Sequence, residues 1–571
     1  MLPWLSLLNN SLCFGLYRNG RQIGFARVVT DMVETWVIRN LFISPEYRFV
    51  GTAPAGIKPA GRTRMSGFFQ FILRPPINSD RLCGAFACLQ PALKEYIMSG
   101  LILVSHNQCQ RSTLTAIYDG ILTRQGGLWI SWDGKSTVIP DDALRPCAVQ
   151  QTGQYKTVTF PMTPGELNEG YRHYIHKGLW PVFHQRPDMA RFSASGFQAY
   201  KSLNKAYARA ICENITPDDV IWIQDYHLLS CAAFLREEGL TQPVGFFLHQ
   251  PFPAGRIFET IPEWRWLTES LLCCDLIGFQ TVQDMNNFIV WLEGEFRTER
   301  LESHCFRVHG RIIRVGVFPV GIDLDDVQAL RESNSCVFME MQCRDSLPEN
   351  RVLSGGHLDE SSGLPYRIST LEVLLRRHEC YQKNITLLQL ASPAAGHEHD
   401  ASAVGQALEA RCGEFNGVHG TMNWYPVNYL TQAYSREEQA GIYRASRVAL
   451  VTPLMAGMSL MAKMYVALQD PNNPGVLILS QFAGAAEQLE GAITVNPYDP
   501  DGMASAVHTA LQMPLRERRN LHARLMNILH IHNSHAWAGS FLRMLINVPD
   551  EPASLPPPTI FPRLSSSRAR Y

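Results

Sequence analysis

The sequence predicts an α/β protein whose core consists of two domains, each built on a parallel, doubly wound sheet. Short apolar runs with the composition of buried strands recur along most of the chain, and helix-length segments separate them. These runs also form two successive series, which is typical of two Rossmann-like domains that face each other. Ligands of such sheets bind beyond the carboxyl ends of the strands, so the residues that follow each run are the first candidates for a site.

A short β-rich fragment, residues 1–55, precedes this core. Three strands are predicted in it, at residues 12–17, 23–30 and 36–43. Residues 48–53 (RFVGTA) resemble the loop of a GNAT-type acetyltransferase whose amides hold the pyrophosphate of coenzyme A. Pro54 and Pro59 obstruct the helix that should follow such a loop. We therefore expect a GNAT-like fragment without a working site, and an added β-hairpin or a fusion remnant is the alternative.

The remaining elements follow in order along the chain. Residues 56–97 are predicted to be a linker, and residues 546–571, with their Pro and Ser runs, a disordered tail. The first domain is expected over residues 98–325, with strands at 101–105, 220–223, 244–248, 276–279 and 315–319. The second domain is expected over residues 326–545, with a helix at 436–444 and strands at 352–354, 385–390, 448–453, 476–480 and 493–495.

Composition excludes several classes of function. Lys plus Arg number 51 and Asp plus Glu 52, a net charge of -1, so neither nucleic acid nor an anionic membrane is expected as a partner. The 14 cysteines lack the spacing of a disulfide framework, which favours reduced thiols and a cytoplasmic location. A signal peptide and a long apolar run are both missing from the sequence. A small molecule is the expected partner.

Several stretches that follow predicted strands carry a more specific pattern. They are IWIQDYHLL at 221–229, GFFLHQPFP at 245–253, DLIGFQT at 275–281, FPVGID at 318–323 and LSQFAGAA at 479–486. These stretches closely resemble the trehalose-6-phosphate synthase family, and the resemblance covers residues 98–545. It implies a GT-B fold, in which an acceptor-binding domain and a nucleotide-sugar-binding domain close over a cleft.

The resemblance also implies a reaction, in which UDP-glucose and glucose 6-phosphate give trehalose 6-phosphate and UDP with retention at the anomeric carbon. No metal or other cofactor is expected. The charge of the leaving diphosphate must then be met by cationic side chains and amide dipoles.

On the acceptor side the family residues are present. Asp225 and His249, each just after a strand, match residues that contact sugar hydroxyls near the reacting carbon, so they are the catalytic candidates. Tyr171, Trp180 and Trp132 match acceptor-wall positions. Core packing is the alternative for each aromatic ring, a helix N-cap for Asp225 and a buried structural histidine for His249.

On the donor side several family residues are replaced. The family reads V-E-R-L-D-Y-S-K-G where residues 355–363 read GGHLDESSG, so His357 and Ser362 stand for an Arg and a Lys that contact the diphosphate. The family's R-D-G-M-N-L-V-A-K-E reads MAGMSLMAKM at 455–464, so Ala456 and Met464 replace the Asp that contacts donor glucose and the Glu that holds the ribose.

Three further positions differ in the same way. Residues 105–107 (SHN) stand where the family has S-N-R, about 112–113 (ST) where it has a glycine pair, and about Ala395 where it has a phosphate-binding Arg. Of the expected donor-site groups, Gly457 and the amides of Leu460 and Met461 remain, at a predicted helix start that can hold a phosphate. Protonated His357 can restore part of the lost charge, which predicts activity at acidic pH.

Two functions remain open. The first is a trehalose-6-phosphate synthase-type glycosyltransferase with a weakened donor site. The second is a catalytically silent relative that binds a sugar phosphate or acts as a regulatory subunit, either as a homo-oligomer or together with another synthase subunit. Histidine clusters at 397–400 and 530–535 lack zinc spacing, and P-loop, dinucleotide-binding and serine-hydrolase motifs are missing.

Overall fold

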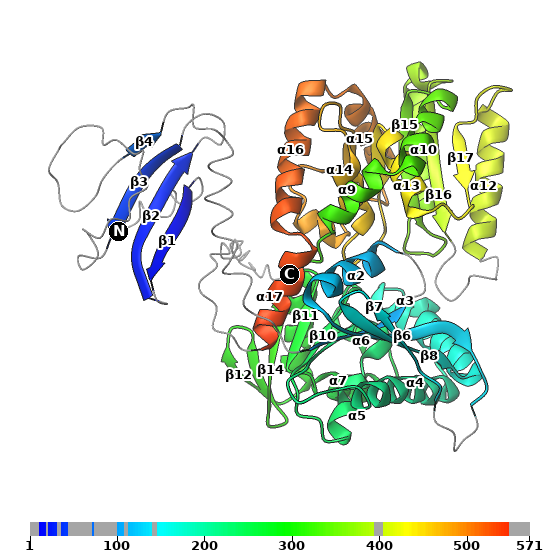
Figure 1. Ribbon diagram of the computed structural model, residues 1–571. Coiled ribbons are helices and arrows are strands. Elements are labelled where there is room, and N and C mark those ends of the chain that lie inside the picture. The colour runs from blue at the N-terminus through cyan, green and yellow to red at the C-terminus, as the bar shows by residue number, and fades with distance from the viewer. Residues whose placement is uncertain are drawn as a thin grey trace, which may run out of the picture. The chain divides into compact units, whose positions relative to one another are not determined.

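The computed structural model describes residues 11–18, 21–30, 36–43, 71–73, 100–107, 112–139, 145–392 and 403–546 (Figure 1). The chain divides into two compact units, residues 1–97 and 98–571. Within the described part, no helix is both long enough and apolar enough to cross a bilayer. The predicted tail lies almost wholly outside the described residues, which end at 546.

The first unit contains an antiparallel sheet in the order β1-β2-β3-β4. Its strands are β1 (Ser11–Arg18), β2 (Arg21–Thr30), β3 (Trp36–Ile43) and β4 (Phe71–Leu73). The three predicted strands are confirmed. The linker prediction is wrong at β4, because this apolar run pairs antiparallel with residues 36–38 of β3. The acetyltransferase-like loop at 48–53 lies outside the described residues.

The second unit begins with a sheet of ten strands in the order β12-β13-β14-β11-β10-β9-β5-β6-β8-β7. The run from β14 to β8 is parallel throughout, and a hairpin at one edge and β7 at the other are antiparallel. The strands are β5 (Leu101–Asn107), β6 (Gly127–Ser136), β7 (Ala148–Thr152), β8 (Tyr155–Met162), β9 (Val220–Gln224), β10 (Val244–Phe247), β11 (Leu276–Phe279), β12 (Thr298–Glu302), β13 (Cys305–Val308) and β14 (Arg311–Val317).

A second sheet of six strands, all parallel, has the order β17-β16-β15-β18-β19-β20. Alternate residues of its central strands are buried in different clusters: Val352 and Leu387 lie in one, Leu353 and Leu388 in another. Both faces are therefore covered, as a parallel sheet requires. The strands are β15 (Asn350–His357), β16 (Ile385–Ser392), β17 (Val427–Leu430), β18 (Val448–Val451), β19 (Val476–Ser480) and β20 (Ile493–Val495).

Helices connect these strands and flank both sheets (Figure 1). Capping side chains fix several helix ends. Helix α13, for example, begins with a capping box between Ser435 and Glu438. The longer helices are α2 (Thr113–Gln125), α4 (Ala194–Cys212), α5 (Cys231–Glu237), α7 (Trp264–Leu271), α8 (Val282–Glu295), α9 (Leu324–Glu332), α10 (Asn334–Ser346), α11 (Leu364–Arg377), α12 (Ala403–His419), α13 (Arg436–Ala445), α14 (Leu460–Leu468), α15 (Pro500–Gln512), α16 (Leu515–Ile531) and α17 (Ser534–Leu545).

The last helix, α17, departs from the predicted division at residue 325. It follows α16 in the chain but lies beside the first sheet, next to β11 (Figure 1). The Trp537 and Phe541 rings lie 4.7 Å and 4.9 Å from the Trp222 ring of β9. These apolar side chains gain burial only against the first sheet, so the end of the chain returns to the first domain and ties the two domains together.

Candidate functional site

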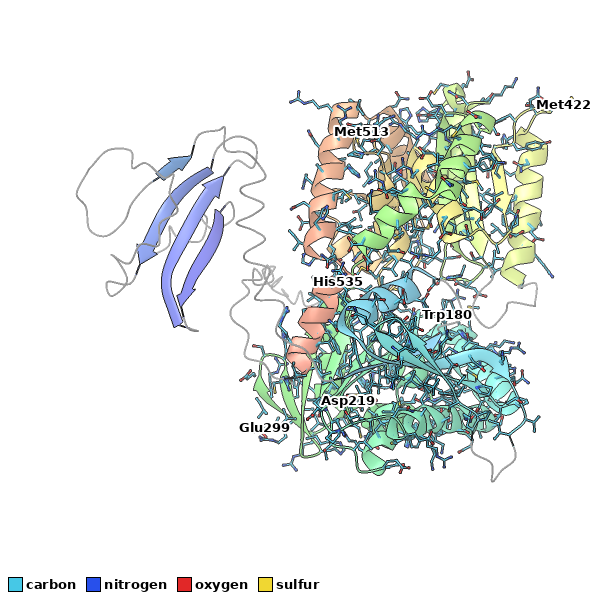
Figure 2. All side chains as sticks on the ribbon, in the orientation of Figure 1. Trp180, Asp219, Glu299, Met422, Met513 and His535 are labelled. Carbon is cyan, nitrogen blue, oxygen red and sulfur yellow. The ribbon has the colours of Figure 1, made fainter. Side chains whose placement is uncertain are left out.

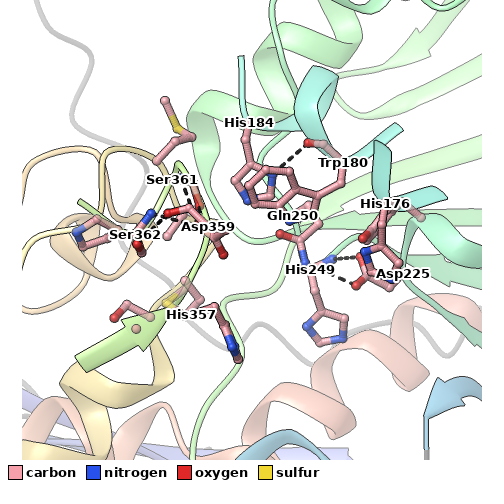
Figure 3. Close-up of a pocket in the computed structure, with 18 of the residues that line it drawn as sticks. His176, Trp180, His184, Asp225, His249, Gln250, His357, Asp359, Ser361 and Ser362 are labelled. Carbon is pink, nitrogen blue, oxygen red and sulfur yellow. Dashed lines mark hydrogen bonds between the residues drawn. The ribbon is translucent and has the colours of Figure 1, made fainter. Parts of the chain in front are cut away.

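A cavity of about 1220 Å³ lies at the carboxyl ends of both sheets of the second unit. One side, which we call the first wall, consists of its lining residues between Ser105 and Val320. The other side, the second wall, consists of those from Gly355 onward. The first wall includes Tyr171, Trp180, Asp225 and His249, and the second wall includes His357, Ser362, Gly457, Leu460 and Met461. The structure thus brings together every predicted site residue except Trp132. Figure 3 labels five of them, Trp180, Asp225, His249, His357 and Ser362.

Asp225 stands at the junction of two neighbouring strands. It follows β9 directly and has φ 70°, an uncommon backbone state for a residue with a side chain. Its Oδ1 accepts a hydrogen bond from the His249 backbone N–H at 3.1 Å, and its Oδ2 accepts one from Gln250 Nε2 at 3.4 Å (Figure 3). Burial raises the pKa of Asp225 to about 6. At neutral pH the site therefore holds a partly buried carboxylate that can accept hydrogen bonds from hydroxyl groups.

His249, after β10, is fixed by three side chains. Gln280 Oε1 accepts from the Val320 backbone N–H at 3.0 Å, so its Nε2 faces His249 Nδ1 at 3.3 Å as the donor. The proton of the neutral ring then lies on Nε2, which contacts Gln224 Oε1 at 3.0 Å and the Tyr118 hydroxyl at 2.8 Å. Burial lowers the pKa of His249 to about 3, which keeps the ring neutral. Any contact of this ring with a ligand must compete with these bonds.

Tyr171 and Trp180 come from one stretch of chain. Tyr171 lies in the wide π-type helix η3 (Glu166–Leu179), a helix type that often marks functional positions. Trp180 follows it and stacks on His184 with ring centroids 4.1 Å apart. Trp180 lies between the two domains of the second unit (Figure 2). Trp132 does not line the cavity, and its ring lies 5.3 Å from His106 and 5.6 Å from Tyr171, so it supports both.

His106 was noted in the sequence only as a departure from the family, yet it is a central part of the first wall. It ends the buried part of β5 and stacks on His227, with ring centroids 4.7 Å apart and planes 2° apart. Tyr171 stacks on it at 4.5 Å. The sequence carries no periodic or motif signal for this stack, because its three residues come from three separate segments.

The second wall is built on the turn after β15. Asp359 Oδ1 accepts hydrogen bonds at 2.9 Å from the Ser361 and Ser362 backbone amides and from the Ser361 hydroxyl (Figure 3). The Ser362 hydroxyl donates to Asp359 O at 2.8 Å. The Ser362 hydroxyl is therefore already used by the turn, and His357 lies exposed at the end of the strand.

A buried cation that the sequence did not reveal lies behind this turn. Arg367 of α11 is 1% exposed, and its guanidinium donates to four protein oxygens. These are Thr452 Oγ1 at 3.0 Å, Ser354 Oγ at 2.9 Å, Gly355 O at 2.8 Å and Ser362 O at 2.7 Å. Burial lowers its pKa to about 9, so it stays charged at neutral pH. Most of its N–H groups already donate hydrogen bonds to protein oxygens, so few remain to bind a ligand.

The charges of the second wall are unfavourable for an anion. Residues 355–362 and 451–461, all within the described part of the chain, contain no Lys or Arg, whereas Asp359 and Glu360 line the cavity. Gly457 also has a packing role: a Cβ there would lie 1.9 Å from His249 O of the first wall. The amides of α14 begin after Ser459, which has φ 91° and offers no side-chain cap. Leu460 and Met461 line the cavity, so this helix start faces it.

No group of three or more His, Cys, Asp and Glu side chains suited to a metal ion occurs within the described residues. The histidines at 530–535 lie at the junction of α16 and α17, and the cluster at 397–400 lies outside the described part.

Comparison with known proteins places this site in a family. The model of glycosyltransferase family 20 matches residues 104–547. A trehalose-6-phosphate synthase of Sodalis glossinidius is 35% identical over 461 residues, which cover 80% of this chain and 97% of that protein. One of Klebsiella pneumoniae is 36% identical over 431 residues, covering 75% of this chain and 90% of that protein.

Comparison with solved structures indicates the same family. An α,α-trehalose-phosphate synthase (UDP-forming) of Burkholderia xenovorans in complex with glucose-6-phosphate has a TM-score of 0.74 at 34% identity, covering 78% of this chain and all of that one. The Escherichia coli protein bound with UDP-2-fluoro glucose has a TM-score of 0.73 at 34% identity, covering 79% and 99%. The fold is therefore the predicted GT-B fold, and the chain belongs to glycosyltransferase family 20, with trehalose-6-phosphate synthases as its relatives.

Proposed function

We propose that this protein is a trehalose-6-phosphate synthase-type glycosyltransferase in which transfer from the nucleotide sugar is slow. In this proposal Asp225, Tyr171 and Trp180 hold the acceptor sugar, His249 shapes the site around it, and UDP-glucose is the donor. His357, Ser362 and the amides after Gly457 form a weakened donor site. No metal takes part, so the departing diphosphate depends on protein groups alone.

The observation that carries this proposal is the contrast in charge between the two walls. The first wall has a partly buried carboxylate and aromatic rings, which suit a sugar. Among the described residues, the second wall has Asp359 and Glu360 and one guanidinium, Arg367, that already donates to the oxygens of the turn. A diphosphate in this place meets carboxylates where its developing charge requires cations.

The expected size of the defect follows from general magnitudes. Loss of one preorganised donor to a developing anion costs about 3 kcal/mol of transition-state stabilisation. Loss of two costs roughly 6 kcal/mol, or about four decades in rate, if they act independently. Binding of the nucleotide through helix amides is less affected, because it does not depend on the charge that develops in the transition state.

The test is UDP release from UDP-glucose with glucose or glucose 6-phosphate as acceptor, with the Klebsiella pneumoniae relative measured alongside. We expect slow but measurable release. Release as fast as that of the relative contradicts the weakened donor site. No release at all, together with sugar binding, favours the alternative, in which the protein is a silent regulatory subunit; co-purification with an active synthase is then the next measurement.

A third candidate, an acetyltransferase fused to a sugar-binding module, rests on residues 12–53 alone. Strands β1 to β3 are the only part of that likeness among the described residues, and the family model begins after it at residue 104. Titration of the full chain with acetyl-CoA tests it, and no detectable binding removes it.

A further inference from the structure

A series of buried hydrogen bonds joins the first wall to helix α14 of the second domain. Gln280, which is 1% exposed, follows β11, and its Nε2 faces His249 Nδ1 at 3.3 Å. Its Oε1 accepts a hydrogen bond from the Val320 backbone N–H at 3.0 Å. The Val320 carbonyl oxygen in turn accepts one from Lys463 Nζ, on α14, at 2.6 Å. Side chains of both domains are therefore connected through the backbone of one residue.

Val320 lies in the segment that leads from the first sheet to the second domain. This segment runs from the end of β14 at Val317 to the start of α9 at Leu324. The segment that returns the chain to α17 packs directly against it, because a Cβ added at Gly321 would lie 2.2 Å from His532 O. Val320 is itself only 1% exposed. Because close-packed interiors transmit strain, a shift of α14 should pass through this segment to the first wall.

Each end of this series reaches the cavity. At the first wall, Gln280 leaves Nδ1 of His249 as an acceptor, and the His249 backbone N–H donates to Asp225 Oδ1 at 3.1 Å. At the second wall, Lys463 shares the first turn of α14 with Leu460, which lines the cavity. Lys463 is 0% exposed and is not among the described residues that line the cavity. It can therefore affect a bound sugar only through its protein partners.

We propose that Gln280 and Lys463 are positioning residues that couple the sugar site of the first wall to helix α14 of the second wall. Gln280 holds the proton of the His249 ring on Nε2, and Lys463 holds Val320 and thereby the Gln280 amide. The geometry of the sugar site then depends on a side chain of the other domain. The inference rests on the proposed function, in which Asp225 and His249 belong to that sugar site.

The first test needs no ligand. In full-length protein with isotope-labelled histidine nitrogens, the NMR signals of His249 are identified by their loss in His249→Gln. Gln280→Met removes the donor to Nδ1, so the ring should populate its other tautomer and both nitrogen signals should shift. Lys463→Met should shift them in the same direction, and it decides alone if Gln280→Met does not fold. Unchanged His249 signals in the folded variants overturn the inference.

Gln469 supplies a matched control. It is 3% exposed, and like Gln280 it accepts from a backbone N–H and donates from Nε2. Its partners are Gly475 N at 2.8 Å and Tyr443 O at 2.7 Å, both in the second domain, and it is not among the described residues that line the cavity. Gln469→Met should leave the His249 signals in place. If it shifts them as Gln280→Met does, the cause is a general loosening of the fold, and the positioning role is rejected.

Sugar affinity measures the coupling itself. In calorimetric titrations of the full chain with glucose 6-phosphate, we expect affinity about fivefold lower in Gln280→Met and about threefold lower in Lys463→Met, each near the worth of one hydrogen bond. Because both residues act through Val320, the double variant should lose about fivefold and no more. A loss of about 15-fold, the product of the single effects, would show independent contributions and overturn the coupling.

The two measurements separate this inference from the proposed function. Wild-type protein without measurable binding of glucose 6-phosphate contradicts the proposed function, and the histidine signals still decide whether Gln280 and Lys463 position His249. Sugar binding that both single variants retain at the wild-type affinity keeps the proposed function and overturns the inference.

Discussion

The two walls of the cavity are built alike but differ in chemistry. Each includes residues that follow parallel strands, and each has an ionised group, the partly buried Asp225 in the first wall and the buried Arg367 in the second. The Asp225 carboxylate accepts hydrogen bonds from the His249 backbone N–H and from Gln250 Nε2, but its side chain is still 14% exposed. The Arg367 guanidinium is bound to four protein oxygens and the residue is only 1% exposed. A charged group in a wall can therefore serve a ligand only if the fold leaves part of its hydrogen-bonding capacity accessible.

The largest expected effect concerns Arg367. Because its guanidinium satisfies four buried oxygens, Arg367→Met should lower the free energy of unfolding by about 3 kcal/mol. Arg376→Met, an exposed position of the same helix, is the control and should change it by less than about 0.5 kcal/mol. Urea denaturation measures both. Unchanged stability in Arg367→Met would mean that the guanidinium is free to serve a ligand, and the contrast between the walls would fail.

Gly457 tests how closely the walls approach. An added Cβ would lie 1.9 Å from His249 O, so Gly457→Ala should push the walls apart and cost about 2 kcal/mol of stability. Gly413→Ala in α12 meets no atom within 4 Å and should instead stabilise the protein by about 0.5 kcal/mol. Thermal unfolding distinguishes the two. Equal melting temperatures would show that the contact between the walls is not held in solution.

Lys463 connects the walls and gives the stability a pH dependence. Its Nζ, on α14, donates to Val320 O at 2.6 Å and Gln488 Oε1 at 2.5 Å. Burial lowers its pKa to about 7 in the folded protein, against 10.5 for the free side chain. Between these values the unfolded chain binds more protons, so Lys463 makes stability rise with pH over that window, by about 1 kcal/mol per pH unit. Lys463→Met should remove that part of the slope in denaturation series at pH 7.5 to 10; an identical slope in both proteins contradicts it.

The smallest effect concerns Asp225 as a sugar ligand. Burial raises its pKa to about 6, so the carboxylate is protonated as pH falls through that value. Binding that needs the carboxylate should then be about fourfold weaker at pH 5.5 than at pH 8. Asp225→Asn should bind weakly at both values. A wild-type affinity that does not change with pH would remove the carboxylate from the acceptor contacts.

Much of the fold follows from local sequence patterns. All ten core strands predicted from apolar runs are present, as are the three of the first unit, because each run carries its own β-forming residues. The hairpin of β12 and β13 was missed because its side chains are largely polar and exposed. The packing of α17 against the first sheet was missed because the sequence does not show against which element an apolar helix face packs.

The site residues that lie in family motifs could be predicted from the sequence, and the other site residues could not. Asp225 and His249 stand in long family motifs, and they line the cavity as expected. Arg367 was missed because an Arg in an amphipathic helix has the pattern of a surface residue, and only the tertiary fold buries it. His106 was missed as a part of the first wall because its place there depends on the rings stacked around it, which are distant in the chain.

The most direct test of the weakened donor site restores its cations. His357→Arg/Ser362→Lys places an Arg and a Lys at the positions where the family resemblance implies them, and UDP release is measured beside the wild type at pH 7.5. The account predicts slow wild-type release and an increase of at least about 100-fold in the variant, since each donor is worth about 3 kcal/mol. Rapid wild-type release that the two substitutions leave unchanged would contradict it.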